Sequence, residues 1–339
     1  MMPQSNEIFT LSIESSCDDT SAAILCNDRV LSNIVASQKI HELYGGVVPE
    51  LASRAHQQNI VAVVDVAIKQ AGISKKQLSA IAYTNGPGLM GSLLVGTSFA
   101  KTLSLSLDIP LLQVNHMQAH VAAHYIDNKP QFPFLCLTVS GGHTQIVLVK
   151  DYLEMEVIGH TIDDAVGEAF DKAAKVMNLP YPGGPLVDKY AQLGNASKYS
   201  FPTPARNGLN YTFSGVKTAF LNFVQKGKQA NPNFLEDELH DISASYQQHL
   251  IHYLLKVFLM ASDEYGIKEL AIAGGVSANS GLRKALGQLS EQGYTTHIPK
   301  FEYCTDNAAM IGIVGYYKFL NQDFASIDLM PFTRGGALL

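Results

Sequence analysis

The sequence predicts an α/β protein made of two lobes that share one plan. First, its 339 residues exceed the length at which a single hydrophobic core usually stops growing. Second, short apolar strands alternate with helical segments along the whole chain. Third, one order of elements occurs twice: a hairpin with a polar turn, a helix, and a strand that ends in a glycine turn. Because the halves share this order without visible sequence identity, we expect a duplication of plan.

The first half is expected to begin with a strand that starts near Phe9 and ends at Glu14, because Phe9, Leu11 and Ile13 alternate with polar neighbours. Further strands are expected at residues 22–25, 30–36 and 81–84. Apolar residues at helical spacing after Pro49 predict a helix, and Gly72 is placed to end it. A second helix should follow the turn at residues 85–91.

The second half repeats this order. Strands are expected at residues 135–139, 146–149, 155–159 and 270–273, and helices through residues 242–257 and after the glycine turn at 274–279. Residues 179–235 interrupt the alternation of strands and helices with many prolines, glycines and asparagines, and we interpret them as an insertion. We therefore expect an N-terminal lobe at 1–131 and a C-terminal lobe at 132–339, whose final helix packs back on the first lobe.

The composition is that of an ordinary globular protein, with 47% hydrophobic residues and a mean hydropathy of +0.07. No apolar run approaches the roughly 18 residues of a membrane span, and no basic-then-apolar leader is visible. The four cysteines form no CxxC pair, which is typical of reduced thiols in the cytoplasm. A net charge of −6 gives no overall attraction to nucleic acid, so RNA binding would need a local basic patch or a partner.

Two histidines four residues apart form the first candidate site. His116 and His120 would lie on one helix face, close enough to share a metal ion, although such pairs also arise by chance. Met117 and Gln118 replace the Glu of an HExxH motif, which argues against a zinc protease. Asp306 is a candidate third ligand, or else caps the following helix. Two histidines and one carboxylate would suit Fe²⁺ and tolerate Zn²⁺.

Four turns built from glycine or hydroxyl residues form the second constellation. They follow short strands at residues 15–16, 86–88, 140–142 and 274–275. Turns without bulky side chains expose backbone N–H groups that bind phosphate, so four at matching points favour a nucleotide between the lobes. The chain has neither a GxxxxGK[ST] P-loop nor a GxGxxG dinucleotide fingerprint.

Carboxylates form a third group. Asp163, Asp164, Glu168 and Asp171 would line one helix face, which in most proteins is simply solvated. Asp171, together with Asp188, could instead accept hydrogen bonds from a ribose or an ammonium group, and the residues alone leave this open.

Motifs that cover nearly the whole chain, in one order, carry a family resemblance. They are IESSCDDT at 13–20, GGVVPELASR at 45–54, TNGPGL at 84–89, the histidine pair at 116–120, VSGGHT at 139–144, GEAFDK at 167–172, YPGGP at 181–185, FSGVKT at 213–218, GGVSAN at 274–279 and CTDN at 304–307. In these motifs the chain resembles the tRNA threonylcarbamoyladenosine transferase (TsaD, or Kae1/Gcp-like) family.

The resemblance implies a duplicated actin/Hsp70/sugar-kinase-like fold with an adenine nucleotide between two lobes. It implies an acyltransferase that moves threonylcarbamoyl from threonylcarbamoyl-AMP to the N6 amine of the adenosine 3′ of the anticodon. His116, His120 and Asp306 match the family's metal ligands. Its nucleotide- and substrate-binding positions match Val139, Ser140, Gly141, Gly142, His143, Asp171, Gly184, Asp188 and Asn279. Asp18 matches an acidic position near the site and is our candidate base.

The resemblance also implies partners. The expected set is tRNA, a paralogous TsaB-type subunit in a heterodimer, a TsaE-type P-loop ATPase and a TsaC-type synthase that supplies the intermediate. No membrane role is expected. Thr138 stands where archaeal and eukaryotic relatives place a metal-ligating tyrosine, so the chain resembles the bacterial type. Asp19 stands where many members have Glu, which leaves the role of that carboxylate open.

Three rival functions remain to be weighed. A metalloprotease would need the histidine pair for peptide cleavage but lacks the HExxH glutamate. A non-catalytic nucleotide-binding scaffold would be expected to have lost the metal ligands. A small-molecule kinase of the same fold would not need the histidines. The resemblance favours the transferase over all three.

Overall fold

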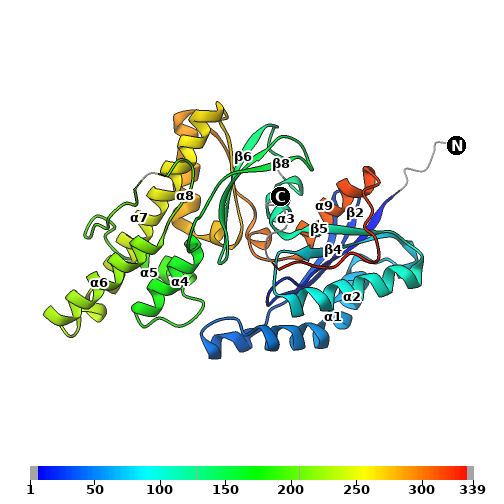
Figure 1. Ribbon diagram of the computed structural model, residues 1–339, viewed down its shortest axis with the longest axis horizontal. Coiled ribbons are helices and arrows are strands. Elements are labelled where there is room, and N and C mark those ends of the chain that lie inside the picture. The colour runs from blue at the N-terminus through cyan, green and yellow to red at the C-terminus, as the bar shows by residue number, and fades with distance from the viewer. Residues whose placement is uncertain (1–6, 128, 206, 334–339) are drawn as a thin grey trace. The chain divides into compact units, whose positions relative to one another are not determined.

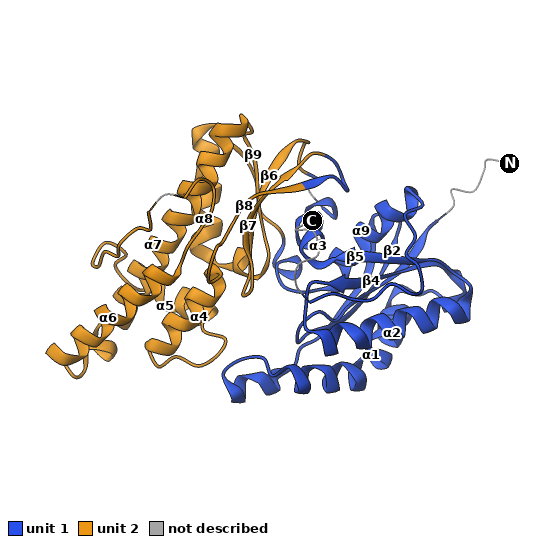
Figure 2. Ribbon diagram, viewed as in Figure 1, with its two compact units in different colours: residues 1–129, 151–155, 300–339 blue, residues 130–150, 156–299 orange. Residues whose placement is uncertain are grey.

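The structure is a computed structural model that describes residues 7–127, 129–205 and 207–333 (Figure 1). The chain divides into two compact units (Figure 2). Unit 1 comprises residues 1–129, 151–155 and 300–339, and unit 2 comprises residues 130–150 and 156–299. The chain thus leaves unit 1 and returns to it, so that late segments pack with the first ones.

Unit 1 is built on a mixed sheet with the strand order β3-β2-β1-β4-β5. Its strands are β1 (Phe9–Glu14), β2 (Thr20–Cys26), β3 (Arg29–Ala36), β4 (Leu78–Gly86) and β5 (Leu111–Asn115). β1 pairs antiparallel with β2 and parallel with β4, and β4 pairs parallel with β5. The carboxyl ends of β1, β4 and β5 therefore meet at one edge of the sheet.

Helices cover both faces of this sheet (Figure 1). On one face, α1 (Pro49–Ala71) contacts β2 and β3, and α2 (Met90–Leu107) contacts β4; on the other, α9 (Ala308–Leu320) contacts β1, β2 and β4. The expected helix stop is confirmed: Gly72 takes a φ of 70° and its N–H caps Lys69 O. Short elements complete the unit: η1 (Lys39–Tyr44), η2 (Lys75–Gln77), α3 (His116–Ala122), η3 (Ala123–Tyr125) and η6 (Phe301–Tyr303).

Unit 2 carries a second sheet with the order β10-β9-β6-β7-β8. Its strands are β6 (Phe134–Val139), β7 (Thr144–Val149), β8 (Met155–His160), β9 (Glu269–Ala273) and β10 (Thr295–His297). β6 pairs antiparallel with β7 and parallel with β9, as β1 does with β2 and β4. Each strand thus takes the place of its counterpart in unit 1, which confirms the predicted duplication.

The helices of unit 2 pack around one large hydrophobic core. They are α4 (Val166–Val176), α5 (Gly184–Ala191), α6 (Ser214–Ala230), α7 (Phe234–Tyr265) and α8 (Ser280–Gln288), with η4 (Gly275–Ala278) and η5 (Leu289–Gln292). Phe220 and Phe258 are buried in this core, and Tyr246 of α7 joins α4 by donating a hydrogen bond to Ala169 O. Residues 179–235, expected as an insertion, contain α5 and α6 between irregular stretches.

The sequence patterns miss two edge strands and misplace some side chains. β5 has five residues, too few to show a period, and β10 has the sequence Thr-Thr-His, which carries no apolar alternation. Asp163 and Asp164 precede α4, so they do not line its face with Glu168 and Asp171 as expected. Ser214 Oγ at the start of α6 donates to Asp163 Oδ2 at 2.7 Å, and Asp164 Oδ2 accepts hydrogen bonds from Lys217 of α6 and Lys172 of α4.

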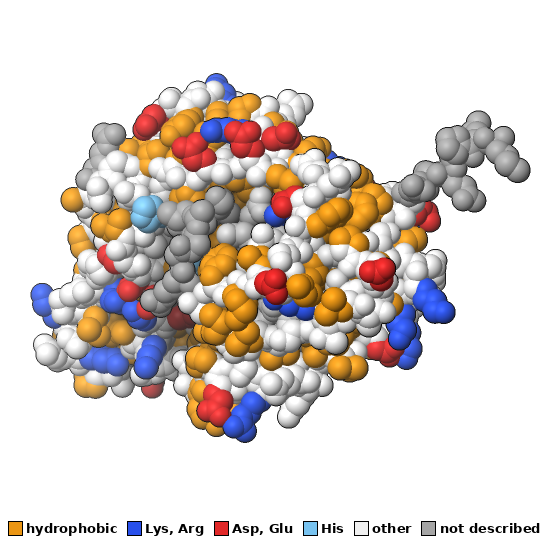
Figure 3. All heavy atoms as spheres, turned by 45° about the vertical axis from the view of Figure 1, so that its right-hand side comes forward, with side chains coloured by type: hydrophobic (Ala, Val, Ile, Leu, Met, Phe, Trp, Pro, Cys, Tyr) orange, Lys and Arg blue, Asp and Glu red, His pale blue; other side chains and the backbone are white. Residues whose placement is uncertain are grey.

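The surface combines apolar and charged side chains. Exposed large apolar residues include Leu43, Val61, Leu105, Phe301 and Met330. On the face drawn in Figure 3, apolar side chains gather in several patches separated by Lys, Arg, Asp and Glu. Within the described ranges, no helix combines the length and apolar character needed to cross a membrane.

The packing of α9 on the sheet requires glycine and gives a first prediction. A Cβ at Gly312 would lie 2.4 Å from Leu25 Cδ1 and 2.8 Å from Ser12 Oγ. We expect Gly312→Leu to lower the free energy of unfolding by about 1–3 kcal/mol or more, because the helix cannot approach β1 and β2. Denaturant titration measures this change.

Gly287→Ala in α8 is the control, since a Cβ there meets nothing within 4 Å. It should leave the protein as stable as the wild type or stabilise it by up to about 1 kcal/mol. Wild-type stability for Gly312→Leu would contradict the close packing of α9.

Candidate functional site

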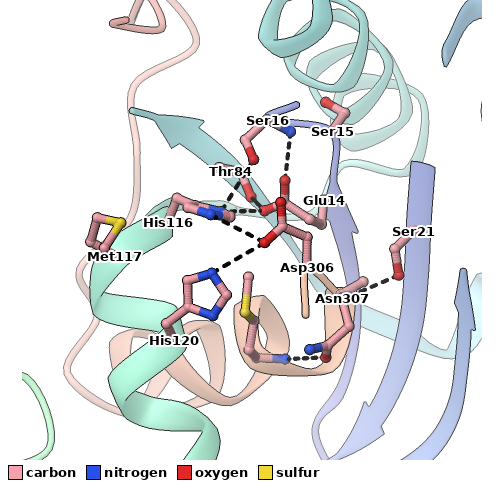
Figure 4. Close-up of polar contacts among 12 residues, drawn as sticks. Glu14, Ser15, Ser16, Ser21, Thr84, His116, Met117, His120, Asp306 and Asn307 are labelled. Carbon is pink, nitrogen blue, oxygen red and sulfur yellow. Dashed lines mark hydrogen bonds and ion pairs between the residues drawn. The ribbon is translucent and has the colours of Figure 1, made fainter. Parts of the chain in front are cut away.

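The histidine pair lies on α3, directly after β5. The Asn115 side chain starts this helix, because its Oδ1 accepts hydrogen bonds from Met117 N at 2.8 Å and Gln118 N at 3.2 Å. A spacing of four residues places the two rings on one face, with centroids 4.7 Å apart (Figure 4). Both side chains are buried: His120 is 1% exposed and His116 is 8% exposed.

Asp306 reaches the same point from the loop before α9. Its Oδ1 lies 3.1 Å from His120 Nε2 and 3.5 Å from His116 Nε2. One ligand atom from each of the three side chains lies within 4.8 Å of the others. The alternative role of Asp306 as a helix cap is wrong, because Asn307 caps α9 by accepting Met310 N at 3.1 Å.

The chemistry of these three side chains fits a divalent metal ion. Within the described ranges, neither ring nitrogen of His120 makes a hydrogen bond, although the side chain is buried and its Nε2 meets the Asp306 carboxylate at 3.1 Å. A buried imidazole that makes no hydrogen bond is costly unless a ligand satisfies it. Two nitrogens and one carboxylate oxygen facing one point form a donor set that suits Fe²⁺ or Zn²⁺.

Glu14 is a residue that the sequence patterns do not single out. It ends β1 and is fully buried, and its Oε2 lies 3.0 Å from His116 Nδ1. The same oxygen accepts Thr84 Oγ1 at 2.5 Å, and Oε1 accepts Ser16 N at 2.5 Å. A carboxylate at the end of an apolar strand was the available signal, because such a group is rarely buried without a partner.

The charges of Glu14 and His116 support each other. Burial disfavours a charge on His116, but the Glu14 and Asp306 carboxylates outweigh it and raise the pKa of His116 to about 9. Burial likewise opposes the charge of Glu14, yet His116 holds the pKa of this carboxyl below its usual range. The pair is therefore an ionic contact at neutral pH whenever Nε2 of His116 binds no metal.

Two further acids follow Glu14 in the polar turn after β1. Asp18 and Asp19 are both partly exposed. The pKa of Asp19 is raised to about 7, first by burial and then by the charges of Asp18 and Asp306. Burial and the charge of Asp18 also raise the pKa of the Cys17 thiol, so this cysteine stays protonated.

In unit 2, the turn after β6 holds its shape without help from bulky side chains. Ser140 N donates to His143 O at 2.8 Å, and His143 N donates to Ser140 Oγ at 3.0 Å. Gly141 and Gly142 are exposed, and a Cβ at either would meet nothing within 4 Å. Val139, by contrast, is fully buried at the end of β6. The turn therefore presents backbone that is open to a ligand.

Asp171 and Gly184 lie together at the start of α5. Asp171 Oδ1 accepts Gly183 N at 2.9 Å and Gly184 N at 3.0 Å. Burial raises the pKa of Asp171, although these two N–H groups act against the rise. The carboxylate is thereby fixed in orientation at the N-terminus of a helix.

Asp188 and Asn279 lie together in a second group that includes two residues the sequence patterns miss. Asp188 Oδ1 accepts Gln247 Nε2 at 3.0 Å and Ser280 Oγ at 2.7 Å, and Oδ2 accepts Ser280 N at 3.0 Å. Asn279 Nδ2 donates to Gln247 Oε1 at 2.7 Å. Much of the hydrogen-bonding capacity of Asp188 thus joins α5, α7 and α8 inside unit 2.

The candidate residues fall into two sets. The histidine pair, Asp306, Glu14 and Asp18 belong to unit 1. The expected nucleotide- and substrate-binding residues, which are Val139, Ser140, Gly141, Gly142, His143, Asp171, Gly184, Asp188 and Asn279, belong to unit 2 (Figure 2).

The sequence of this chain is similar to proteins of one family. The TsaD family model, described as tRNA N6-adenosine threonylcarbamoyltransferase, matches residues 29–313. A protein of that name from Christiangramia forsetii is 61% identical over 333 residues, covering 97% of this chain and 98% of the relative. Another from Cytophaga hutchinsonii is 57% identical and covers 100% of both chains.

A solved structure supports the fold alone. HypF from T. kodakarensis has a TM-score of 0.62 at 16% identity, covering 94% of this chain and 48% of that one. This likeness and the two sheets of equal strand order confirm the expected actin/Hsp70/sugar-kinase-like fold. By the match of the family model and the identity to full-length relatives, the chain belongs to the TsaD family of tRNA N6-adenosine threonylcarbamoyltransferases.

Proposed function

We propose that the chain transfers threonylcarbamoyl from threonylcarbamoyl-AMP to the N6 amine of the adenosine 3′ of the anticodon, in tRNAs that read codons beginning with A. AMP is the leaving group. The observation that carries this proposal is 61% identity over almost the whole length of a relative named for the reaction, together with the intact His-His-Asp cluster. The cluster argues against a scaffold, and the absent HExxH glutamate argues against a protease.

His116, His120 and Asp306 are the proposed ligands of one divalent metal ion. Fe²⁺ is the favoured ion and Zn²⁺ the alternative, because two histidines and one carboxylate leave open coordination positions. When bound, the ion supplies a Lewis acid that can polarise the donor's carbonyl without a change of oxidation state. The chain's own part is to hold the three side chains on α3 and before α9, so that Nε2 of each histidine faces the carboxylate.

Residues of unit 2 are proposed to hold the adenylate. The exposed backbone of Gly141 and Gly142 can donate N–H groups to a phosphate or to charge that develops on the transferred carbonyl. Asp171 and Asp188 are suited to accept ribose hydroxyl groups, and Asn279 lies beside Asp188. Val139, Ser140, His143 and Gly184 shape the two turns around these groups.

The acceptor amine must lose a proton during transfer, and Asp18 is the proposed base. It is partly exposed in the turn that follows Glu14, so a substrate can approach it. Asp19 beside it has a pKa raised to about 7, so this carboxylate is only partly ionised at neutral pH.

Partners are proposed to complete the enzyme. A net charge of −6 is unfavourable for tRNA binding, so basic surfaces of other subunits would compensate. We propose a TsaB-type paralogue as heterodimer partner, a TsaE-type ATPase, and a TsaC-type synthase that supplies the adenylate, all in the cytoplasm.

Transfer of labelled threonylcarbamoyl from its adenylate to unmodified tRNA tests the reaction. We expect label in the RNA when the purified chain is combined with the TsaB- and TsaE-type partners, because the acidic chain needs help to bind tRNA. The matched control is a tRNA with guanosine in place of the acceptor adenosine, which should stay unlabelled. If both tRNAs stay unlabelled with all partners present, the proposed reaction is wrong.

Loss of a ligand tests the metal site. We expect His120→Ala to abolish bound metal, measured by elemental analysis, and to abolish transfer while circular dichroism stays unchanged. This variant is cleaner than His116→Ala, which also leaves the buried Glu14 charge without a partner at a cost of about 3–5 kcal/mol. Full activity in a metal-free His120→Ala protein would show that the triad, which is His116, His120 and Asp306, is not the metal site that the reaction needs.

The base assignment predicts different behaviour for the two neighbouring acids. We expect Asp18→Asn to lower the transfer rate by about 10²–10⁴-fold while metal content and the KM for the adenylate stay near wild type. Asp19→Asn is the comparison, and its rate should fall less. A larger loss in Asp19→Asn than in Asp18→Asn would move the role of base to Asp19.

A further inference from the structure

Glu14 contacts the one nitrogen of His116 that faces away from the candidate metal position (Figure 4). His116 Nε2 faces Asp306 Oδ1 at 3.5 Å, whereas Nδ1 lies 3.0 Å from Glu14 Oε2. The hydroxyl of Ser16 lies 3.2 Å from the same Nδ1. Each ring nitrogen of this histidine therefore has its own set of neighbours.

The hydrogen-bonding capacity of Glu14 decides which nitrogen of His116 carries the proton. A carboxylate can only accept a hydrogen bond, so Nδ1 must donate to Glu14. In a histidine that binds a metal through one nitrogen, the other nitrogen keeps its proton and donates it to a neighbouring acceptor. When Nε2 gives up its proton to a metal, the contact with Glu14 keeps the other proton on Nδ1, so the lone pair of His116 lies on Nε2, toward Asp306.

Glu14 is itself held tightly. Thr84 Oγ1 donates to Oε2, and Ser16 N donates to Oε1, both at 2.5 Å. Together with His116, these donors satisfy a carboxylate that is 0% exposed. An amide at this position would place an NH₂ group against at least one of these donors, so a glutamine cannot reproduce the arrangement.

We propose that Glu14 is a positioning residue for the metal site: it fixes the proton of His116 on Nδ1, orients the ring, and makes Nε2 the ligand atom. This inference rests on the proposed ligand set of His116, His120 and Asp306. Glu14 acts through His116, because its Oε2 contacts Nδ1 of that ring and the carboxylate among the proposed ligands is that of Asp306.

The first test measures metal affinity by competition with a chelator, using Zn²⁺ or Fe²⁺ alone with the full-length chain. We expect Glu14→Gln to weaken binding by about 10–100-fold, the usual effect of losing a carboxylate behind a histidine ligand. Glu14→Asp keeps the charge on a shorter side chain and should recover part of the affinity. Wild-type affinity in Glu14→Gln would overturn the proposal.

A spectroscopic readout separates positioning from a general loss of stability. In the zinc-loaded protein with ¹⁵N-labelled histidine, the Nδ1 proton of His116 should give a downfield resonance because it is bonded to a carboxylate. This resonance should move upfield in Glu14→Gln. An unchanged resonance would overturn the proposal even if the affinity falls.

Variants of Thr84 test the same arrangement without touching the carboxylate. Thr84→Val removes the hydroxyl that holds Glu14 and should weaken metal binding, whereas Thr84→Ser keeps the hydroxyl and should not. If Glu14→Gln fails to fold, the comparison of the two Thr84 variants tests the role of Glu14 instead. Equal metal affinities of these two variants would then overturn the proposal. Asp163→Asn is a matched control that should keep the metal affinity of the wild type, because Asp163 accepts its hydrogen bonds from Thr212 and Ser214 in unit 2.

His120→Ala separates this inference from the proposed metal site. If His120→Ala binds metal like the wild type, the triad assignment fails and the inference fails with it. If His120→Ala loses metal while Glu14→Gln and Thr84→Val retain it, the triad stands and only the role of Glu14 is overturned.

Discussion

A fully buried carboxylate at the end of β1 constrains most of the candidate metal site. Taking the charge of Glu14 out of water is costly unless donors replace the water. The parallel sheet supplies them through its register. Ile13 pairs with Tyr83, so the next residues, Glu14 and Thr84, lie side by side where β1 and β4 end. β5 ends at the same edge, and α3 begins there with His116.

Segments that return from unit 2 close this edge of the sheet. The loop before α9 brings in Asp306, and Ala308 N donates to Ser21 Oγ of β2 at 2.8 Å. Farther along, Phe332 N donates to Asn85 O at 3.0 Å, next to Thr84. Gly86 takes a φ of 144°, and a Cβ there would lie 2.3 Å from Phe332 O, so glycine is required for this approach. The strand end that holds Glu14 is thus fixed from both sides.

How far the sequence predicts this arrangement depends on the range of each interaction. The strand periods and the repeated order of elements predict the two sheets, because the periods and the order can each be recognised from residues that are close together in the sequence. The spacing of His116 and His120 predicts their shared face for the same reason. The roles of Glu14 and Gln247 depend on which strands and helices become neighbours. No local pattern contains that information, so neither residue can be identified as part of a site from the sequence alone.

The two acids expected to bind ribose differ in the capacity they keep for a ligand. Each carboxylate oxygen can accept about two hydrogen bonds. Asp188 uses both oxygens for Gln247 and Ser280. Asp171 places its bonds to Gly183 and Gly184 on Oδ1 alone, so Oδ2 keeps its full capacity in the part of the chain that the structure describes.

This difference assigns unequal roles to the two carboxylates. The backbone bonds orient Asp171 before any ligand arrives, which lowers the entropy lost on binding. A hydroxyl group that binds at Asp188 must instead share acceptors that already join three helices. The contacts therefore favour Asp171 as the main acceptor for a ribose hydroxyl, with Asp188 chiefly holding α8 and Asn279 in place.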